Sequence, residues 1–522
     1  MISDIASTDG TLSCDICIVG SGVIGLALMR ELRRSRLRVI VLESGGRGRE
    51  GAIDDIQASE VLGEEFLGAR EGRVRQLGGT SNIWGGQALP MDPIDFMKRD
   101  WIPRSGWPLD PKVLPPLYAR ASDFLGVDHN DYDKDVFNRF KISLPQAFPA
   151  HRYRYHVSKW APNAKLIDVY RRGIERADSL QVICHATVTD ITLSPNGSSV
   201  EHLVARSLDG RHLRVSARQF VLAVGAIEVA RLLLASGVRG GRPIGGGNAH
   251  IGRYLMDHPS GPIGSLVPKD SRAVQRLFNV FYIGRRKFSA RISLLEAAQQ
   301  EHRLLNVSCG FNFQSLPGSG IDVLRRGAGA VRSRDTRAVT KAALAAVPAL
   351  PGLIAWGYRR AIDRRAYDPG SKIGLVVNAE QPPMAENRVE LSLATDSMGI
   401  PRSRINWHPT AATERTVRWF ANHLECDFRT SGIGSLKLEP WVSALGAGTS
   451  LRDAFHPMGT ARMARSARDG VVDVDGRLFG VDNLSIAGTA VFPTSGHSNP
   501  TLTAIALAIG LADRLKIALL AS

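Results

Sequence analysis

The sequence predicts an α/β fold in which a parallel sheet with a crossover helix is joined to an α+β region with an antiparallel sheet. Three patterns support this prediction. Residues 14–45 read as strand, glycine turn, helix and strand, with the segments CDICIVG, SGVIGLALMRELRRS and RVIVLES, which is a right-handed βαβ unit. Residues 181–222 alternate as short strands, and SKIGLVVNAE and NRVELSLA add further strands later in the chain. A chain of 522 residues is long enough for two lobes with a large core.

The glycine turn of the first unit carries a specific motif. Gly20, Gly22 and Gly25 form G-x-G-x-x-G between a strand and a helix. The first glycine permits the tight turn, the second lets backbone approach a pyrophosphate, and the third lets helix and strand pack closely. Glu43 ends the next strand, where an acid binds ribose hydroxyls. The unit therefore predicts a Rossmann-type site for FAD or NAD rather than NADP, and its place near the start of the chain favours FAD.

The later elements follow from their own patterns. Residues 46–110 are rich in glycine and include QLGGTSNIWGGQALP at 76–90, and a long stretch of this kind in a compact enzyme is more often functional than idle. Helical and loop material is expected at 101–179, including Leu114 to Leu125. A strand that ends in VLAVGA predicts a second glycine turn at Gly225. The remaining expected elements are a helix at 411–430, a strand at Asn483–Ala487 and a closing helix at about 500–517.

Composition limits the classes of function. The net charge of +16 would suit acidic partners, but no nucleic-acid motif accompanies it, so we expect an arginine-rich soluble enzyme without a nucleic-acid partner. Five scattered cysteines describe no disulfide framework, and we expect no metal site because no metal-ligand spacing occurs. The first residues lack the pattern of a signal peptide, and no run of about 18 apolar residues is present. These observations predict a cytoplasmic protein without a membrane span.

Residues 323–365 form a segment of distinct character. Arginines flank the apolar run AALAAVPALPGLIAW, which Pro348 and Pro351 interrupt. We expect this run to be too short and too broken to cross a bilayer. The segment would suit a lid, an oligomer contact or an interfacial anchor held by its basic flanks. The interpretation that we favour is a surface helical insertion that packs on its own protein, ahead of membrane contact.

Five motifs in order resemble the glucose-methanol-choline (GMC) oxidoreductases, and the resemblance covers the chain nearly end to end. They are CDICIVGSGVIG with VLESG, QLGGTSNIWGG, QFVLAVGAIEVARLLL, IGRYLMDHP, and a C-terminal block that runs from FHPMGTARM to HSNPTLTAIALAIGLADRL. The resemblance implies the GMC fold, with a Rossmann-type FAD-binding domain formed by residues 1–100, 180–265 and 450–522. It assigns residues 101–179 and 266–449 to an α+β substrate-binding domain.

The resemblance also implies the site residues. The family's catalytic pair falls on His456 and Asn499, with His456 as the base that accepts the hydroxyl proton and Asn499 as the holder of the substrate oxygen. The position of the family's covalent flavin link is occupied by Ile83, which predicts non-covalent FAD. His497 is expected to be supporting or close to the cofactor, and His258 to be structural. The expected cofactor-binding residues are Gly20, Gly22, Gly25, Glu43, Gly79, Thr80, Asn82, Trp84, Gly85, Val188, Gly225, Gly488, Thr489, Asn499, Pro500 and Thr501.

The expected reaction is oxidation of a CH–OH group by hydride transfer to FAD. A His/Asn pair and the general layout resemble bacterial members that act on sugars and glycosides, so we favour oxidation of a ring secondary alcohol to a keto-sugar. Oxidation of a primary alcohol, aliphatic or on an amino-sugar, to an aldehyde is the second interpretation, and a lyase with structural FAD is an alternative of another class. The electron acceptor, whether oxygen, quinone or a partner protein, and the oligomeric state stay open.

Overall fold

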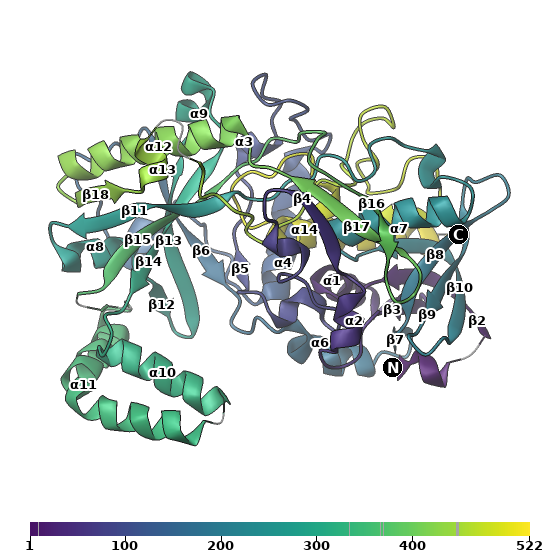
Figure 1. Ribbon diagram of the computed structural model, residues 1–522, viewed down its shortest axis with the longest axis horizontal. Coiled ribbons are helices and arrows are strands. Elements are labelled where there is room, and N and C mark those ends of the chain that lie inside the picture. Colours follow the sequence, from purple (N-terminus) through teal and green to yellow (C-terminus); the bar gives the residue numbers. More distant parts are fainter. Residues whose placement is uncertain (9, 334, 366, 369, 445–447, 522) are drawn as a thin grey trace.

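The computed structural model describes residues 1–522 except 9, 334, 366, 369, 445–447 and 522. Two lobes lie side by side, each built around a large sheet, and a two-helix projection extends from one of them (Figure 1). The predicted combination of a parallel sheet with a separate antiparallel sheet is confirmed.

The first lobe contains a mixed sheet with the order β1-β7-β3-β2-β10-β9-β8, and β19 pairs with β10. Its central strands are parallel, whereas β9 pairs antiparallel with both β10 and β8. The residues of β2 from Ile16 to Val19 are buried, as expected of a parallel strand covered on both faces. The strands are β1 Ile2–Asp4, β2 Gly10–Val19, β3 Val39–Leu42, β7 Leu180–Cys184, β8 Thr187–Leu193, β9 Val200–Arg206, β10 His212–Leu222 and β19 Leu484–Ile486.

Helices cover the parallel part of this sheet. The closing helix α14 packs on both α1 and α4, and α6 packs on α1. Because α4 and α6 lie within 101–179, the first lobe includes elements from a range that the sequence assigns to the substrate domain. The helices of this lobe are α1 Val23–Leu32, α2 Gly51–Asp55, α3 Pro93–Phe96, α4 Leu114–Leu125, α6 Leu166–Glu175, α7 Ala226–Arg239 and α14 Thr501–Leu520.

The second lobe contains an antiparallel sheet with the order β18-β11-β15-β14-β13-β6-β5, and β12 pairs with β13. One face is apolar and packs against α12, whose buried side chains include Phe420 and Leu424. The strands are β5 Gln87–Ala88, β6 Tyr153–Trp160, β11 Ser260–Pro268, β12 Phe281–Ile283, β13 Arg286–Leu294, β14 Val307–Gln314, β15 Lys372–Ala379 and β18 Gly434–Leu438. The helices are α5 Val136–Phe140, α8 Ser271–Phe278, α9 Glu296–His302, α12 Ala411–Thr430 and α13 Pro440–Ser443.

A small third sheet links distant parts of the chain. Strands β16 Arg388–Thr395, β17 Pro401–Trp407 and β4 Ser59–Gly63 form it, and α7 packs against β16 and β17. The helix predicted at 411–430 is confirmed with those bounds, and the predicted closing helix is α14.

The segment at 323–365 differs from its prediction. It forms a hairpin of α10 Gly320–Ser333 and α11 Thr336–Ile362, and α11 is one continuous helix of 27 residues with Pro348 and Pro351 inside it. By length and composition, α11 is apolar enough to cross a membrane, and its apolar window is 0% buried within the protein. The expectation that the prolines break the run is therefore wrong, as is the expectation of packing on the body of the protein. Both prolines lie on the exposed side of the helix, where unpaired carbonyls remain accessible to solvent.

Candidate active site

The glycine motif forms a cradle for a phosphate group. Gly20 has φ 97° and lies against the carbonyl of Ala223, and a Cβ on Gly25 would lie 2.1 Å from the Gly20 carbonyl oxygen. A Cβ on Gly22, in contrast, would meet nothing within 4 Å. Gly22 is the N-cap of α1 and makes no side-chain capping bond, so the first N–H groups of the helix point toward this open position. This is the arrangement that a dinucleotide pyrophosphate requires.

The second glycine segment packs directly onto the first. Gly79 has φ 51°, and a Cβ on it would lie 2.8 Å from the Cα of Gly22. Gly78 N–H donates to Ser21 Oγ at 3.2 Å. Two segments nearly 60 residues apart, 20–25 and 76–86, therefore enclose one site.

Glu43 organises the edge of this site. Its carboxylate accepts from the Ser21 hydroxyl at 2.6 Å and from the Gly45 N–H at 2.9 Å. Burial raises the pKa of Glu43, and these hydrogen bonds act in the opposite direction. Val188 lies next to Thr187, whose hydroxyl is 2.7 Å from that of Ser44, so the start of β8 adjoins the Glu43 loop. The acid and Val188 thus lie at neighbouring positions.

The other expected cofactor residues lie on the same side of the parallel sheet or in the C-terminal loops that meet it. Asn82 is held by carbonyls of Leu77 and Gly79, and its own buried Oδ1 has no partner. Gly225 caps α7, and Gly488 lies where an added Cβ would be 3.5 Å from Ile24 of α1. The remaining positions are Thr80, Trp84 and Gly85 in the second glycine segment, Thr489 in a short 3-10 turn, and Pro500 and Thr501 at the start of α14.

The predicted catalytic pair meets in space. His456 lies in the long segment between α13 and β19, and Asn499 lies just before α14. Asn499 Nδ2 is 3.3 Å from His456 Nε2, although 43 residues separate them. The Oδ1 atom of Asn499 is buried and has no partner within the described protein. An orphaned polar atom beside an imidazole marks a place for a hydroxyl-bearing ligand.

A second histidine fixes the tautomer of His456. His258 Nε2 is 3.1 Å from the carbonyl of Ser495, so this nitrogen carries the hydrogen. Burial lowers the pKa of His258 well below the usual range, which keeps the ring neutral and leaves Nδ1 as an acceptor. His258 Nδ1 and His456 Nδ1 are 2.9 Å apart, so His456 must donate there. The lone pair of His456 is therefore on Nε2, the nitrogen that faces Asn499.

Two buried carboxyl groups hold the backbone that carries His456. Asp257 accepts from the backbone N–H groups of Ala454 and His456, each at 2.8 Å. Burial raises the pKa of Asp257 to about 8, against the effect of these hydrogen bonds. Asp453 accepts from the N–H groups of Leu67 and Gly68. Between these anchors Phe455 adopts φ 61°, a left-handed conformation that is costly for a bulky residue. The strained backbone of Phe455 therefore helps to fix the position of His456.

The electrostatic surroundings favour a neutral His456. Burial, followed by the positive charge of Arg291, lowers its pKa to about 4. Arg291 lies on β13, donates to Ser308 Oγ at 3.1 Å, and has its own pKa lowered to about 10 by burial. A neutral imidazole at physiological pH is ready to accept a proton.

The antiparallel sheet turns a polar face toward this loop. The ring of His156, on β6, lies 5.6 Å from that of His497 in the C-terminal loop. In strand register His156 pairs with Arg291, and Ser293 pairs with Ser308. Several buried polar atoms of this region have no partner within the described protein: both ring nitrogens of His156, the hydroxyls of Ser158, Ser293 and Ser498, and His497 Nδ1. Such groups require a polar ligand or water.

His497 links the site to the segment before α3. Its Nε2 is 3.1 Å from Asp92 Oδ2, and the side chain is 1% exposed. Burial opposes ionisation of Asp92, but the bond to His497 and the charge of Arg154 hold its pKa well below the usual range. His497 therefore lies between Asp92 and the ring of His156.

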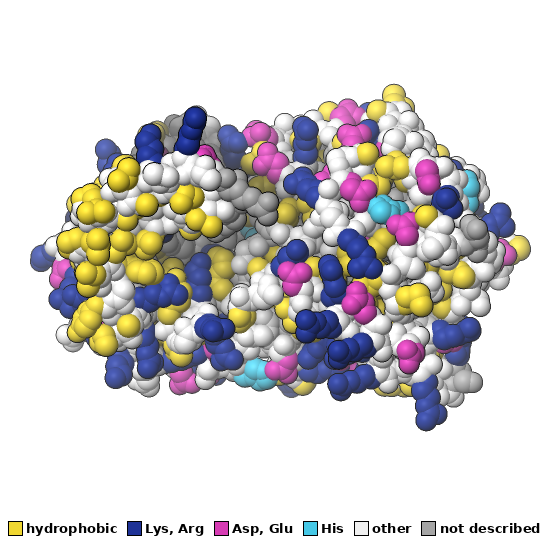
Figure 2. All heavy atoms as spheres, turned by 90° about the horizontal axis from the view of Figure 1, so that it is seen from below, with side chains coloured by type: hydrophobic (Ala, Val, Ile, Leu, Met, Phe, Trp, Pro, Cys, Tyr) yellow, Lys and Arg dark blue, Asp and Glu magenta, His cyan; other side chains and the backbone are white. Residues whose placement is uncertain are grey.

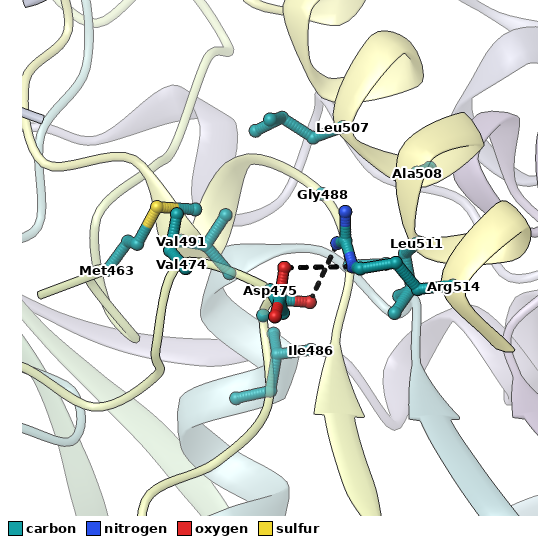
Figure 3. A pocket seen from close by; sticks show the side chains of 12 residues that line it. Met463, Val474, Asp475, Ile486, Gly488, Val491, Leu507, Ala508, Leu511 and Arg514 are labelled. Atoms are coloured by element: carbon teal, nitrogen blue, oxygen red, sulfur yellow. Dashed lines mark hydrogen bonds and ion pairs between the residues drawn. The ribbon is translucent and has the colours of Figure 1, made fainter. Parts of the chain in front are cut away.

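A small crevice beside Gly488 is separate from the catalytic pair. Figure 3 shows that it lies between the 463–491 region and α14, with apolar lining residues such as Met463, Val491 and Leu507. An ion pair of 3.0 Å between Asp475 and Arg514 crosses it. Neither His456 nor Asn499 lines this crevice.

Sequence reasoning missed three residues of the site. His258 contacts His456 directly, Asp257 holds its backbone, and Arg291 lowers its pKa. Asp257 and His258 lie within the motif IGRYLMDHP, so the sequence alone could have indicated that these two residues belong to the site. No sequence pattern pointed to Arg291, because only the register of β13 and β6 places it opposite His156.

Comparison with known proteins identifies a family. Two models of the GMC oxidoreductase family match the chain, one at residues 169–260 and the other at residues 383–508. Two solved structures share the fold. Pyridoxine 4-oxidase from Mesorbium loti has a TM-score of 0.54 at 19% identity and covers 96% of this chain and 99% of its own. A formate oxidase of Aspergillus oryzae has a TM-score of 0.55 at 16% identity, with 98% and 99% covered.

Three curated relatives are 25–32% identical to this chain and differ in how much of it they match. 6'''-hydroxyparomomycin C oxidase from Streptomyces lividus is 25% identical over 94% of this chain and 89% of its own length. C-glycoside 3-oxidase from Arthrobacter globiformis is 32% identical over 30% of each chain. 2-methyl-1,2-propanediol dehydrogenase from Mycolicibacterium austroafricanum is 25% identical over 64% of this chain, and the match spans about half, 53%, of that relative.

The glycine cradle and the His456–Asn499 contact agree with the family matches at both halves of the chain. The chain belongs to the GMC oxidoreductases and is an FAD-dependent oxidoreductase.

Proposed function

We propose that the protein oxidises a secondary ring hydroxyl of a sugar or glycoside to a keto-sugar. The observation that carries this proposal is the polar sheet face opposite His456, with partnerless polar atoms on His156, Ser158 and Ser293. A sugar, which offers a hydroxyl at most ring positions, satisfies such groups, whereas an aliphatic alcohol leaves them unpaired. The relative named C-glycoside 3-oxidase supports the same class of substrate.

The residues of this chain divide the reaction between them. His456 Nε2 accepts the hydroxyl proton, and Nδ1 of the resulting imidazolium donates to His258. Asn499 Nδ2, 3.3 Å from the base, donates to the substrate oxygen as negative charge develops on it. FAD, when bound, supplies the acceptor for the carbinol hydrogen, which leaves as hydride. The alcohol thus loses one proton and one hydride and becomes a carbonyl.

We also propose that FAD is held without a covalent bond. Ile83 occupies the position of the family's linking residue, and a hydrocarbon side chain offers no nucleophile. Gly20, Gly22 and Gly79 would lie at the pyrophosphate, and Glu43 at the ribose. Denaturation of the purified protein should release all the flavin into the supernatant, and flavin that stays with the protein pellet would contradict the proposal.

Oxidation of a primary alcohol on an amino-sugar is the second candidate. The relatives named 6'''-hydroxyparomomycin C oxidase and paromamine 6'-oxidase each match over 94% of this chain, at 25% and 23% identity. The long overlap of these two relatives favours this alternative. The C-glycoside 3-oxidase matches a shorter stretch, 30% of this chain, but its identity there is higher, at 32%, and favours the glycoside.

Anaerobic reduction of the flavin tests the proposal. The holoenzyme is mixed with methyl β-glucopyranoside, its 3-deoxy and 6-deoxy analogues, and paromamine, and the flavin absorbance is followed. Under the proposal both the glucoside and its 6-deoxy analogue bleach the flavin, and loss of bleaching with the 3-deoxy analogue would assign the reaction to the C3 hydroxyl. Bleaching by paromamine alone, or loss of bleaching with the 6-deoxy analogue, would favour the primary-alcohol candidate.

Two variants complete this experiment. His456→Ala should slow bleaching by about 10³-fold, the contribution typical of a general base, while flavin stays bound. His129→Ala removes an exposed histidine with a 53% exposed side chain and should change nothing. Persistent flavin colour with every substrate would instead support a lyase with structural FAD.

A further inference from the structure

The helices α10 and α11 form a hairpin that stands apart from the catalytic machinery. We call residues 320–362 the hairpin. Its helices pack antiparallel on each other: a Cβ on Gly320 would lie 3.1 Å from Leu353, and one on Gly327 would lie 3.5 Å from Ala342. Figure 1 shows the pair projecting below the lobe of the antiparallel sheet.

The hairpin is attached at one place. It is inserted between β14 and β15, which are neighbours in the sheet and pair Gln314 with Lys372 at the ends that face the hairpin. The guanidinium of Arg360, near the end of α11, lies 4.0 Å from the ring of Tyr282 on β12. Both ends therefore return to the same sheet, and the base of the hairpin is fixed against it.

The two sides of α11 differ in what they contact. The side toward α10 carries half-buried residues, among them Ala342 and Leu353. The opposite side carries large apolar residues at spacings of three and four, which places them in one line along the helix. We call this line the outer stripe; it comprises Leu344 (71% exposed), Val347 (65%), Pro351, Ile354 (66%), Tyr358 (61%) and Ile362 (63%).

Helix α10 extends the apolar surface. Leu324 and Val331 are 43% and 65% exposed. Figure 2 shows hydrophobic side chains gathered over the hairpin, with Lys and Arg side chains at the margin. A contiguous apolar surface of this kind marks a site of contact with another apolar phase.

The charge around the surface is strongly positive. Residues 320–364 contain nine basic and three acidic residues, and α11 itself contains no acid. Exposed basic side chains lie in the middle of α10, in the first turns of α11, and at or just after the end of α11: Arg325, Arg326, Arg337, Lys341, Arg360 and Arg364. Two of the acids are already paired, Asp322 with Arg326 and Asp363 with Arg359.

We propose that the hairpin binds the surface of an anionic lipid bilayer, with the outer stripe in the acyl boundary and the basic residues at the headgroups. An apolar helical face with basic margins is the pattern of an interfacial helix. The 27 residues of α11 give a length of about 40 Å for contact.

The attachment of the hairpin excludes a simple crossing. A helix that crossed a bilayer would place its two ends on opposite sides, but both ends of the hairpin join adjacent strands of one sheet. Two crossings would return the chain to its starting side, but the 14 residues of α10 give a length of only about 21 Å, less than the roughly 30 Å of the hydrocarbon core. The hairpin therefore lies on the membrane without spanning it, although α11 alone is long and apolar enough to cross.

Charge also favours lipid over a second copy of the chain. Two hairpins packed through their outer stripes would bring Arg337 and Lys341 close to basic residues of the other copy, either to the same two in a parallel arrangement or to Arg360 and nearby arginines in an antiparallel one. Repulsion between like charges opposes that contact, whereas anionic headgroups attract the same residues.

Vesicle cosedimentation with the holoenzyme tests the proposal. Vesicles of phosphatidylcholine with 30% phosphatidylglycerol are compared with pure phosphatidylcholine, and light scattering measures the oligomeric state. The wild type should sediment with the anionic vesicles and much less with the neutral ones. Leu344→Glu with Ile354→Glu should weaken binding by about a hundredfold, because two large apolar side chains no longer enter the membrane.

A control pair carries the same chemical change elsewhere. Leu393→Glu with Val238→Glu alters residues that are 96% and 69% exposed outside the hairpin, and this variant should bind vesicles like the wild type. Arg337→Gln with Lys341→Gln should reduce binding to the anionic vesicles only. Flavin absorbance establishes that each variant is folded.

Three results would overturn the proposal. They are wild-type protein that stays in the supernatant with anionic vesicles, equal loss of binding in the control pair, and a dimer that the outer-stripe variant dissociates while vesicle binding is unchanged. The last result would assign the outer stripe to a second copy of the chain.

Discussion

At the scale of single residues, the site is organised by a chain of hydrogen bonds that begins at a backbone carbonyl. The Ser495 carbonyl selects the tautomer of His258, and His258 in turn selects that of His456. The outcome is a lone pair on His456 Nε2, beside the side-chain amide of Asn499. One carbonyl thus determines which nitrogen of the base is available for the substrate.

The pKa of His456 leads to a prediction about pH. Burial and Arg291 lower this pKa to about 4, so the neutral, proton-accepting form predominates above that pH. We expect kcat/KM to rise with pH through about 4 and to be level from about pH 6, whereas an ordinary histidine would titrate near 6.5. Measurement of kcat/KM from pH 3.5 to 8, after brief exposure to each buffer, checks this. Arg291→Gln should move the inflection upward, and an inflection that stays near 6.5 in the wild type would contradict the assignment.

His258 gives a second prediction as a positioning residue. His258→Leu leaves the Nδ1 hydrogen of His456 without its acceptor, and a hydrogen bond to a group that becomes charged contributes about 1.5–3 kcal/mol. We therefore expect kcat to fall by about 10- to 100-fold with little change in KM. His258→Asn, which keeps an acceptor, should recover part of this loss. Equal defects in both variants, together with loss of flavin, would indicate that the residue only supports the fold.

The sequence was informative about the residues that carry motifs. His456 and Asn499 could be paired from the C-terminal block, although their 3.3 Å contact depends on folding. The sequence predicts only a structural role for His258, because its motif does not show that its ring reaches another histidine 198 residues away. Arg291 could not be found, since a lone arginine in a strand pattern has no meaning until β6, β13 and β14 are aligned.

At the scale of elements, two glycine turns in contact define the cofactor site. Gly79→Ala would place a Cβ 2.8 Å from the Cα of Gly22, on a residue with φ 51°. This clash is with backbone, which cannot move aside as the end of a flexible side chain can. One of the two glycine turns must therefore shift, and the distance between them must increase. We expect at least a tenfold weaker FAD affinity, measured by fluorescence titration of the apoprotein. Gly48→Ala, where an added Cβ meets nothing within 4 Å, is the matched control. Unchanged affinity in both variants would separate Gly79 from the cofactor site.

The sequence predicts helices correctly where hydrophobic periodicity is strong, and its predictions fail where tertiary contacts determine the secondary structure. The bounds of α4 and α12 agree with the sequence patterns. Strand β6, in contrast, lies in a range where the sequence predicts helix and loop, because its hydrophobic pattern depends on the neighbours that it meets in the sheet. The prolines of α11 predict breaks in the helix, yet an exposed helix face accommodates them.

At the scale of the whole molecule, a buried polar network joins the antiparallel sheet to the C-terminal loop. Glu380, just after β15, accepts two bonds from Arg99, at 2.8 and 2.6 Å, and one from the Asn306 N–H at 2.9 Å. The Asn306 side chain donates to Asp92, whose carboxylate also contacts His497. The two lobes are thereby held in register at the active site.

This network gives the last prediction. Arg99 and Glu380 are 2% and 0% exposed, so removal of one partner leaves the other charge buried without compensation. Arg99→Met should lower the free energy of unfolding by about 3–5 kcal/mol, which urea unfolding followed by flavin fluorescence would measure. The double variant Arg99→Met with Glu380→Met should recover most of this loss, because an apolar pair of similar size replaces the ion pair. Activity should recover less than stability does, since Glu380 also holds the Asn306 backbone that leads through Asp92 to His497. A double variant as unstable as the single one would show that the ion pair is not the interaction that joins the lobes.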